Sequence, residues 1–210
     1  MMKILIVDDH EVVREGVKKI FERKAGAAAF GEAGTAQEAL TLAREEEWDV
    51  AVLDLSLGGR NGLEVLKELK QIRPRLPVLI LSMHSEEQYA RRAFRAGAAG
   101  YVTKGSSRVE LAKAVDKVMK GGKYVTPALA EKLVLSLDRD SQLSPHETLS
   151  DREFEVMCLI ASGKTVTEIG ELLSLSAKTI STYRARILEK MEMKTNAELT
   201  YYAIHNHLVD

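Results

Sequence analysis

The feature that most constrains the fold of this chain is a short apolar run that ends in an acid: Val50–Leu53 leads directly into Asp54. Four consecutive apolar residues without alternation are typical of a strand that is buried on both faces. Asp49 precedes the run, and Gly58 and Gly59 follow it closely, which favours a short strand over a helix. The sequence therefore predicts that Asp54 lies at the carboxyl end of a central parallel strand, where open α/β sheets bind their ligands.

The same arrangement recurs along the first half of the chain. Ile4–Val7 precedes the pair Asp8 and Asp9, and two further apolar runs precede Ser82 and Lys104. Helical periodicity and capping signals lie between these runs, and a fifth strand is expected near residues 27–30. Strands that alternate with helices five times predict an α/β fold with a doubly wound, parallel, five-stranded sheet.

The carboxyl ends of parallel strands share one edge of a sheet, so Asp8, Asp9 and Asp54 are expected to lie together, near Ser82 and Lys104. Three clustered carboxylates repel one another, and a hard divalent cation with oxygen ligands, Mg²⁺ first, relieves that repulsion. A lysine and a small hydroxyl opposite such a cation suit a phosphoryl group. The plain alternative is that Asp54 only caps the next element, which a lone acid would favour.

Composition limits the class of protein. The 210 residues are 45% hydrophobic and 29% charged, and the net charge of −1 gives no sign of nucleic-acid binding by the chain as a whole. Cys158 is the single cysteine, which excludes an internal disulfide framework and fits a reducing compartment. Lys3 is followed by only four apolar residues before Asp8, which is too short for a signal peptide or a membrane span. We therefore predict a cytoplasmic protein with no membrane partner.

The first part of the chain resembles the receiver domain of two-component response regulators, a flavodoxin-like fold. The resemblance covers about Met1 to Gly121. It rests on the pair Asp8 and Asp9, on Asp54 and Ser82, and on Tyr101–Lys104, which occur in this order at the ends of the expected strands. Together these motifs are specific, whereas any one of them alone would be weak.

The resemblance implies a role for each acid. Asp54 would be the phosphoacceptor, and a sensor histidine kinase would be the phosphodonor. Asp9, Asp54 and the backbone carbonyl of Ser56 would hold Mg²⁺, with Asp8 assisting through water. Lys104 would pair with the phosphoryl oxygens, as its charge already suggests.

The resemblance also implies switch residues. Ser82 would follow the phosphoryl group, and Tyr101 would swing inward after it. Ser56 and His84 occupy the positions that tune how long the phosphate lasts in this family, although His84 is equally consistent with a surface residue that has no role. Such a receiver would be no enzyme beyond supporting its own phosphorylation and dephosphorylation. A phosphotransferase or phosphatase with an aspartyl nucleophile is the competing class, but it would want a second acid where Ser56 stands.

The last part of the chain, about Leu149–Asp210, is predicted to be a bundle of short helices. Three helix starts in this part, at Ser150, Thr165 and Thr195, are interpreted as capping boxes, in which Ser or Thr is followed three residues later by Glu, and Thr35 in the first part is interpreted in the same way. The helix-turn-helix pattern occurs here: a helical segment at Ile169–Leu173 is followed by three residues that end in Ser176 and then by a helix from Ala177.

Charge changes sign within this part of the chain. Residues 149–173 carry two basic and five acidic side chains, whereas residues 174–195 carry five basic and two acidic ones. A domain with one basic helix can present a phosphate-binding face without being basic overall. The plain alternative is a solvated surface helix, which we would favour without the turn signature.

Helix geometry assigns faces to the helix that follows the turn. At about 100° per residue, one face is expected to be core and the opposite face is expected to be exposed near the amino end. The expected core residues are Ile180, Ile187 and Met191, and the expected exposed residues are Lys178, Ser181, Thr182 and Ala185.

The segment from Leu149 to Met191 closely resembles the LuxR-type helix-turn-helix, through Leu149–Glu153, Ala161–Lys164 and Leu175–Ile180. With the receiver in front of it, the chain resembles a response regulator of the NarL/FixJ type. The resemblance implies binding to double-stranded DNA, with three base-reading positions, Ser181, Thr182 and Ala185. Four residues could reach phosphates: Lys178, Thr179, Tyr183 and Arg186.

The resemblance divides the chain into a receiver at 1–121, a linker with a short helix (128–137) at 122–148, and a helix-turn-helix domain at 149–210. One such domain covers a single half-site, so a homodimer formed or strengthened on phosphorylation is predicted. The expected function is a phosphorylation-dependent, DNA-binding transcriptional regulator. The competing hypothesis is a phospho-switch that acts through protein–protein interaction or dimerisation without specific DNA binding.

Overall fold

The computed structural model divides the chain into two compact units, Met1–Val134 and Leu135–Asp210. It describes residues 1–25, 28–83, 86–127, 129–131 and 144–209. None of the helices in these ranges has the length together with the apolar character that a membrane-spanning segment needs.

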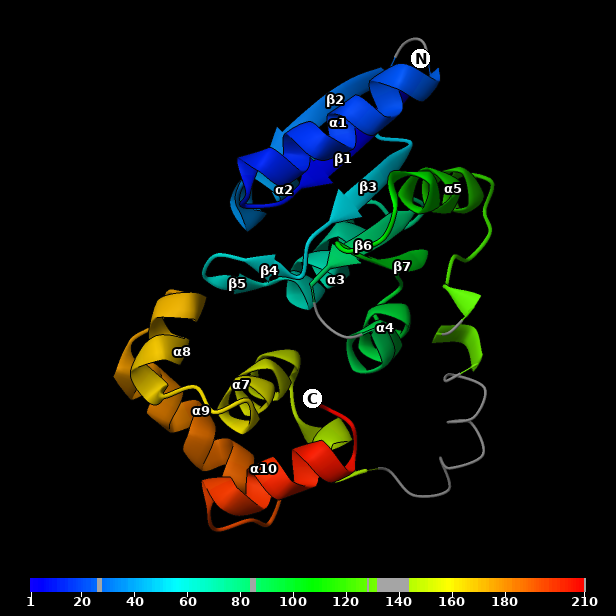
Figure 1. The fold of residues 1–210 in the computed structure, drawn as a ribbon. Helices are drawn as coiled ribbons and strands as arrows, with labels where there is room; N and C mark the ends of the chain where they lie inside the picture. The colour runs from blue at the N-terminus through cyan, green and yellow to red at the C-terminus, as the bar shows by residue number, and fades with distance from the viewer. Residues whose placement is uncertain (26–27, 84–85, 128, 132–143, 210) are drawn as a thin grey trace. The chain divides into compact units, whose positions relative to one another are not determined.

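A five-stranded parallel sheet forms the centre of the first unit (Figure 1). Its strands are β1 (Met2–Val7), β2 (Ala28–Ala33), β3 (Val50–Leu53), β6 (Val78–Ser82) and β7 (Gly100–Thr103). They run in the order β2-β1-β3-β6-β7, and every neighbouring pair is parallel. The predicted doubly wound sheet is confirmed, and the strand expected near residues 27–30 is β2.

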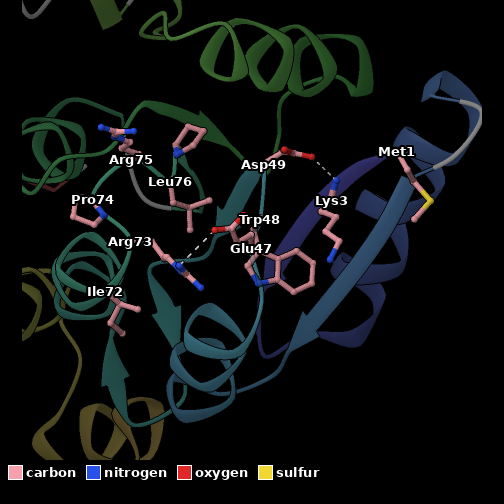
Figure 2. A pocket seen from close by; sticks show the side chains of 11 residues that line it. Met1, Lys3, Glu47, Trp48, Asp49, Ile72, Arg73, Pro74, Arg75 and Leu76 are labelled. Atoms are coloured by element: carbon pink, nitrogen blue, oxygen red, sulfur yellow. Dashed lines mark hydrogen bonds and ion pairs between the residues drawn. The ribbon is translucent and has the colours of Figure 1, made fainter.

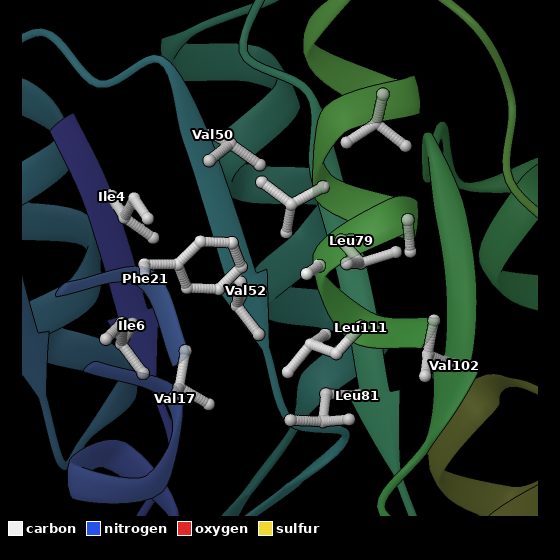
Figure 3. Packing of buried hydrophobic residues seen from close by; sticks show 14 of the residues in the cluster. Ile4, Ile6, Val17, Phe21, Val50, Val52, Leu79, Leu81, Val102 and Leu111 are labelled. Carbon is white, nitrogen blue, oxygen red and sulfur yellow. The ribbon is translucent and has the colours of Figure 1, made fainter. Parts of the chain in front are cut away.

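Five helices accompany the sheet: α1 (Glu11–Ala25), α2 (Ala36–Glu45), α3 (Gly62–Ile72), α4 (Glu86–Arg95) and α5 (Arg108–Met119). Figure 3 shows Phe21 of α1 and Leu111 of α5 packed with Ile4, Val52 and Leu79 of the strands. Side chains alternate between the faces of a strand, so the neighbours of these strand residues point to the opposite face. The strand residues that point to either face of the sheet are almost fully buried. Burial of each such aliphatic or aromatic side chain stabilises the folded state by about 1.5–3 kcal/mol.

A two-stranded hairpin follows Asp54, which the sequence did not lead us to expect. Its strands are β4 (Ser56–Leu57) and β5 (Arg60–Asn61), and they pair antiparallel. Gly59 in the turn has a φ of 87°, a conformation that favours glycine. Asn61 then caps α3, because its Oδ1 accepts a hydrogen bond from Leu63 N at 2.8 Å. The loop after the acid therefore has a defined path.

Gly62 holds this loop against Asp54, and its replacement is a test of the packing. A Cβ atom at Gly62 would lie 2.4 Å from Leu55 Cα and 2.5 Å from the Asp54 carbonyl oxygen. We expect Gly62→Ala to destabilise the unit by about 1–3 kcal/mol, because backbone atoms must move to accommodate the methyl group. The control is Gly16→Ala in α1, where no neighbouring heavy atom lies within 4 Å; it should stabilise the helix by about 0.5–1 kcal/mol. Urea unfolding of the full chain measures both, and equal effects would contradict the argument.

The chain beyond α5 returns to the outer edge of the sheet. Tyr124 forms a parallel bridge with Gly100, and Tyr101 N donates a hydrogen bond to Tyr124 O at 3.1 Å. Tyr124 is thus paired with a strand of the sheet. Residues 127 and 129–131 are helical, and the rest of the short helix expected at 128–137 lies outside the described residues. The boundaries expected at residues 121 and 149 stay predictions.

The second unit is entirely helical in its described part (Figure 1). It contains the 3₁₀ helix η1 (Pro145–Thr148) and the helices α7 (Asp151–Ala161), α8 (Val166–Leu173), α9 (Ala177–Lys190) and α10 (Asn196–His205). Helices α9 and α10 pack on α7, and α8 packs on α9. A Cβ atom at Gly170 would lie 2.7 Å from Leu175 O, so a glycine there lets the turn between α8 and α9 close tightly. The predicted helix-turn-helix is confirmed.

The four predicted capping boxes are of two kinds. At Ser150 and Thr165 both reciprocal hydrogen bonds form, as the pattern predicts. At Thr35 and Thr195 the hydroxyl accepts its bond, but the glutamate accepts from the residue before the cap, Gly34 N or Lys194 N. The φ of the cap residue is −60° and −73° in the first pair and −135° and −133° in the second. The backbone angle therefore decides which N–H group the glutamate reaches.

Candidate functional site

The carboxyl edge of the sheet brings together three charged side chains from three strands. Asp8, Asp54 and Lys104 follow β1, β3 and β7, and their side chains are 3%, 1% and 11% exposed. Lys104 Nζ donates a hydrogen bond to Asp54 Oδ2 at 2.7 Å and lies 2.8 Å from Asp8 Oδ2. The predicted clustering of these residues is confirmed, since the parallel register aligns the strand ends.

Burial and charge act on this cluster in opposite directions. Burial raises the pKa of the Asp54 carboxyl, the hydrogen bond from Lys104 lowers it, and the nearby charge of Asp8 raises it again. Burial alone would lower the pKa of Lys104, but the adjacent carboxylates of Asp54 and Asp8 outweigh burial and raise it. Lys104 is therefore held as an ammonium at neutral pH, and the charged form of Asp54 depends on its cationic neighbours.

The cluster also offers oxygen ligands for a cation. One ligand atom each from Asp8, Asp9, His10 and Asp54 lies within 4.8 Å of the others. Asp54 Oδ1 is buried and has no hydrogen-bond partner among the described residues. Asp9 is more exposed, and its Oδ2 accepts a hydrogen bond from Gly58 N at 3.2 Å. An acidic pocket with an unpaired buried oxygen fits a hard divalent cation.

The remaining receiver residues lie at or near the same edge. Ser82 is the fully buried last residue of β6, and its carbonyl accepts a hydrogen bond from Lys104 N at 2.9 Å. Ser56 starts β4 with an exposed side chain. Tyr101 in β7 is fully buried, so its ring is inside the domain in this structure. His84 lies outside the described residues.

His10 is the member of the cluster that the sequence reasoning missed. Its Nδ1 lies 2.6 Å from Asp9 Oδ1 and 3.3 Å from Asp8 Oδ1, and its backbone N–H donates to Asp8 Oδ1 at 2.9 Å. The available signal was its position directly after the two acids.

A separate depression of ≈ 750 Å³ lies at the opposite, amino-terminal edge of the sheet (Figure 2). There Lys3 N donates to Asp49 Oδ2 at 2.7 Å, and Arg73 Nε donates to Ala43 O at 2.8 Å. These bonds tie the starts of the strands and the end of α2 to their neighbours, so the polar groups have a structural role. The cluster of Asp8, Asp54 and Lys104 lies at the other, carboxyl edge of the sheet.

In the second unit, helix α9 has the two faces predicted for it. Ile180, Ile187 and Met191 are buried, with exposed fractions of 0%, 0% and 4%. The predicted DNA-facing residues are exposed or half-buried, and five of them line a groove of ≈ 330 Å³: Lys178, Thr179, Thr182, Tyr183 and Arg186. Ser181 and Ala185 are exposed.

Two of the basic residues of this segment have partners inside the unit. Lys190 Nζ pairs with Glu153 Oε2 at 2.7 Å, and Arg184 Nε donates to Asn196 Oδ1 at 2.6 Å. Burial opposes ionisation of Glu153, but Lys190 and the Ser150 cap outweigh it and lower the pKa of Glu153. These two cations hold α9 to its neighbours and leave Lys178 and Arg186 on the groove.

The first unit places a buried aspartate beside a lysine at the carboxyl edge of a parallel sheet. The second unit contains a helix-turn-helix with an exposed helix that carries basic side chains. Together these two features define a class of protein. It is the class of DNA-binding regulators that are controlled by phosphorylation. The comparisons agree for both units. Residues 4–116 match the response regulator receiver domain, and residues 147–203 match the bacterial regulatory proteins of the luxR family.

Relatives match over nearly the whole chain. The response regulator GacA of Pseudomonas aeruginosa is 36% identical, over 100% of this chain and 99% of its own. The response regulator UvrY of Escherichia coli K12 is 35% identical, over 99% and 96%. A structure of RcsB from Salmonella enterica serovar Typhimurium, bound to a promoter in the presence of phosphomimetic BeF₃⁻, is 27% identical, covers 96% of this chain and 97% of that chain, and has a TM-score of 0.61.

The chain belongs to the two-component response regulators that join a receiver domain to a LuxR-type helix-turn-helix, the NarL/FixJ type. It is a phosphorylation-dependent, DNA-binding transcriptional regulator.

Proposed function

We propose that Asp54 is the phosphoacceptor and that a sensor histidine kinase is its phosphodonor. The observation that carries the proposal is the buried Asp54 carboxylate, with Lys104 Nζ at 2.7 Å and Asp8 beside it. An Asp54 oxygen would attack the phosphorus, and the bond from phosphorus to the kinase histidine nitrogen would break. Lys104 would pair with the phosphoryl oxygens. The product is an acyl phosphate, which hydrolyses in time and so makes a timed switch.

Mg²⁺ is the cation that we propose for the acidic pocket. Asp9, Asp54 and the backbone carbonyl of Ser56 would hold it, and Asp8 would assist through water. Its support is the spacing of the carboxylates and the buried Asp54 Oδ1, which has no hydrogen-bond partner in the described part of the chain. When bound, the ion neutralises charge on the incoming phosphoryl oxygens. This chain's residues supply the nucleophile, the lysine opposite it and the enclosing hairpin.

The switch residues complete this proposal. The Ser82 hydroxyl would bond a phosphoryl oxygen, and the buried Tyr101 ring would hold the inward state. The side chains of Ser56 and His84 would set access of water to the acyl phosphate. The activity proposed for the chain is limited to its own phosphorylation and dephosphorylation.

The output that we propose is specific binding to double-stranded DNA by a homodimer that phosphorylation forms or strengthens. The groove on α9 and the positive amino end of that helix suit phosphates, while Thr182 and its small neighbours suit base edges. Helix α10 leaves Tyr201 73% exposed and Ile204 51% exposed, and these side chains are candidates for a contact between two copies. A cytoplasmic location belongs to this proposal, because the regulator must meet its DNA there.

Intact mass measurement after incubation with acetyl phosphate and Mg²⁺ tests the proposed phosphorylation. We expect the wild type to gain one phosphoryl group and Asp54→Asn to gain none, since the amide is not a nucleophile. Asp49→Asn is the matched control, because Asp49 is an exposed aspartate at the other end of the same strand. A gain that survives in Asp54→Asn would refute the assignment.

The same samples distinguish the competing functions. A gel shift with random genomic DNA separates a DNA-binding regulator from a switch that acts only through proteins. Gel filtration with and without acetyl phosphate tests the dimer. A phosphorylated protein that neither shifts DNA nor changes size would contradict the proposed output while leaving the phosphoacceptor in place.

A further inference from the structure

Arg14, near the start of α1, is bonded to the backbone that carries two acids of the pocket. Its Nη1 donates a hydrogen bond to the carbonyl oxygen of Asp8 at 2.8 Å, and its Nε donates to Glu32 Oε2 at 3.2 Å. Glu32 belongs to β2, and the Arg14 side chain is 17% exposed. The guanidinium group therefore links the main chain just after β1 to a side chain of the neighbouring strand.

The bond to the Asp8 carbonyl acts on the peptide unit between Asp8 and Asp9. A peptide unit is planar, so holding its oxygen constrains both ψ of Asp8 and φ of Asp9. The N–H group of Asp8 donates to Ala33 O at 3.1 Å, so the preceding peptide unit is held as well. The Asp9 carboxylate reaches the pocket from this backbone, and its Oδ2 accepts from Gly58 N at 3.2 Å. The direction of the Asp9 side chain thus depends on a plane that Arg14 holds.

We propose that Arg14 is a positioning residue for the cation site, because its hydrogen bond holds the Asp8–Asp9 peptide unit where the Asp9 carboxylate can bind Mg²⁺. A ligand that is already oriented loses less conformational freedom when the ion binds. Groups that orient metal ligands typically change metal affinity by about 10–100-fold. This inference deepens the proposed function and rests on the cation site in it.

The charge of Arg14 alone would have the opposite effect. A guanidinium group close to the pocket repels a second cation, so its removal would strengthen Mg²⁺ binding if charge were the only contribution. Positioning predicts weaker Mg²⁺ binding after the same change. The sign of the change in affinity therefore separates the two roles.

Lys18 provides a matched control one turn further along α1. Its side chain is also 17% exposed, and its Nζ donates to Glu32 Oε1 at 2.5 Å, on the same carboxylate that Arg14 contacts. Its other ion pair is with Glu15. Lys18→Met therefore removes a cation from the same helix and a partner from Glu32, while the bond to the Asp8 carbonyl stays in place. Methionine is a good helix former and keeps an apolar stem, so it suits both positions.

Calorimetric titration of the metal-free full chain with Mg²⁺ tests the proposal, and urea unfolding checks that each variant is folded. We expect Arg14→Met to raise the Kd for Mg²⁺ about ten-fold. Arg14→Lys should recover part of the loss, because an ammonium donates to the carbonyl but cannot reproduce the fork geometry of the guanidinium group. Lys18→Met should leave the Kd unchanged.

The Mg²⁺ dependence of phosphorylation by acetyl phosphate gives a second readout. In Arg14→Met the half-saturating Mg²⁺ concentration should rise about ten-fold, while the rate at saturating Mg²⁺ stays nearly unchanged. A merely structural role would lower the saturated rate as well.

Other outcomes would overturn the role of Arg14. They are unchanged or tighter Mg²⁺ binding in Arg14→Met, and an equal loss of affinity in Lys18→Met. Each of them leaves the Mg²⁺ proposal intact. If the wild type did not bind Mg²⁺, the proposed cation site itself would fail, and the inference would fail with it.

Discussion

Replacing Lys104 with Met is expected to destabilise the first unit by about 3–5 kcal/mol in metal-free buffer at neutral pH. Methionine fills a similar length but removes the ammonium that lies 2.7 Å from Asp54 and 2.8 Å from Asp8. Two buried carboxylates would then face each other without a counter-charge. Urea unfolding measures the loss, and added Mg²⁺ should recover part of it, because a bound cation restores positive charge. The phosphorylation rate from acetyl phosphate should fall about 10²–10³-fold.

Asp54→Asn is the matched comparison and should act in the opposite direction on stability. The pKa of Asp54 is raised above its usual value, mainly by burial, so the folded state binds this proton more tightly than the unfolded chain does. The contribution of Asp54 is therefore fully present below its unfolded pKa and is lost as pH rises through the folded pKa. At neutral pH, replacing the carboxylate with a neutral amide should be neutral or stabilising. A Lys104→Met variant as stable as Asp54→Asn would show that the buried pair does not matter.

The second prediction concerns how α9 meets DNA. Lys178→Ala should weaken binding to all DNA sequences about equally, because Lys178 lines the groove suited to phosphates. The slope of log affinity against log salt should fall in magnitude by about 1, as one fewer phosphate is neutralised. Thr182→Ala should instead change which sequence is selected from a random pool. Salt titrations and selection of bound DNA measure the two effects separately.

Thr182 allows a sharper test than truncation alone. Its hydroxyl donates to Lys178 O at 3.0 Å, so toward DNA the side chain can offer an acceptor and a methyl group. If the methyl group contacts thymine, Thr182→Val should keep the preference and Thr182→Ser should lose it. If Thr182→Ala left the selected sequence unaltered and Lys178→Ala changed it, helix α9 would be turned the other way on DNA.

The parallel sheet and most of the residues at its carboxyl edge could be predicted from the order of residues alone. Apolar runs without alternation mark buried strands, and the residue that ends each run must lie at the carboxyl edge of a parallel sheet. Asp8, Asp54 and Lys104 could therefore be predicted to lie together from the sequence. In the structure, Lys104 Nζ lies 2.8 Å from Asp8 Oδ2 and 2.7 Å from Asp54 Oδ2. Periodicity placed Ile180 and Ile187 in the core for the same reason, since a helix repeats its faces regularly.

The direction in which neighbouring side chains point could not be predicted in this way, because it depends on backbone angles in the folded chain. The capping pattern is the same at Thr165 and Thr195, yet the φ angles of −73° and −133° direct the glutamates to different N–H groups. Local composition does not determine that angle, because the path of the preceding chain sets it.

Long-range contacts explain the rest of the difference. Arg184 and Lys190 look like DNA-binding cations in sequence, but Asn196 and Glu153 bind them, and these partners lie 12 and 37 residues away. His10 faces the acidic pocket because its own backbone N–H is held by Asp8, and the hairpin after Asp54 brings Gly58 to Asp9. The sequence pattern determines which residues share an edge or a face, while the direction in which each side chain points depends on backbone angles and on partners distant in sequence.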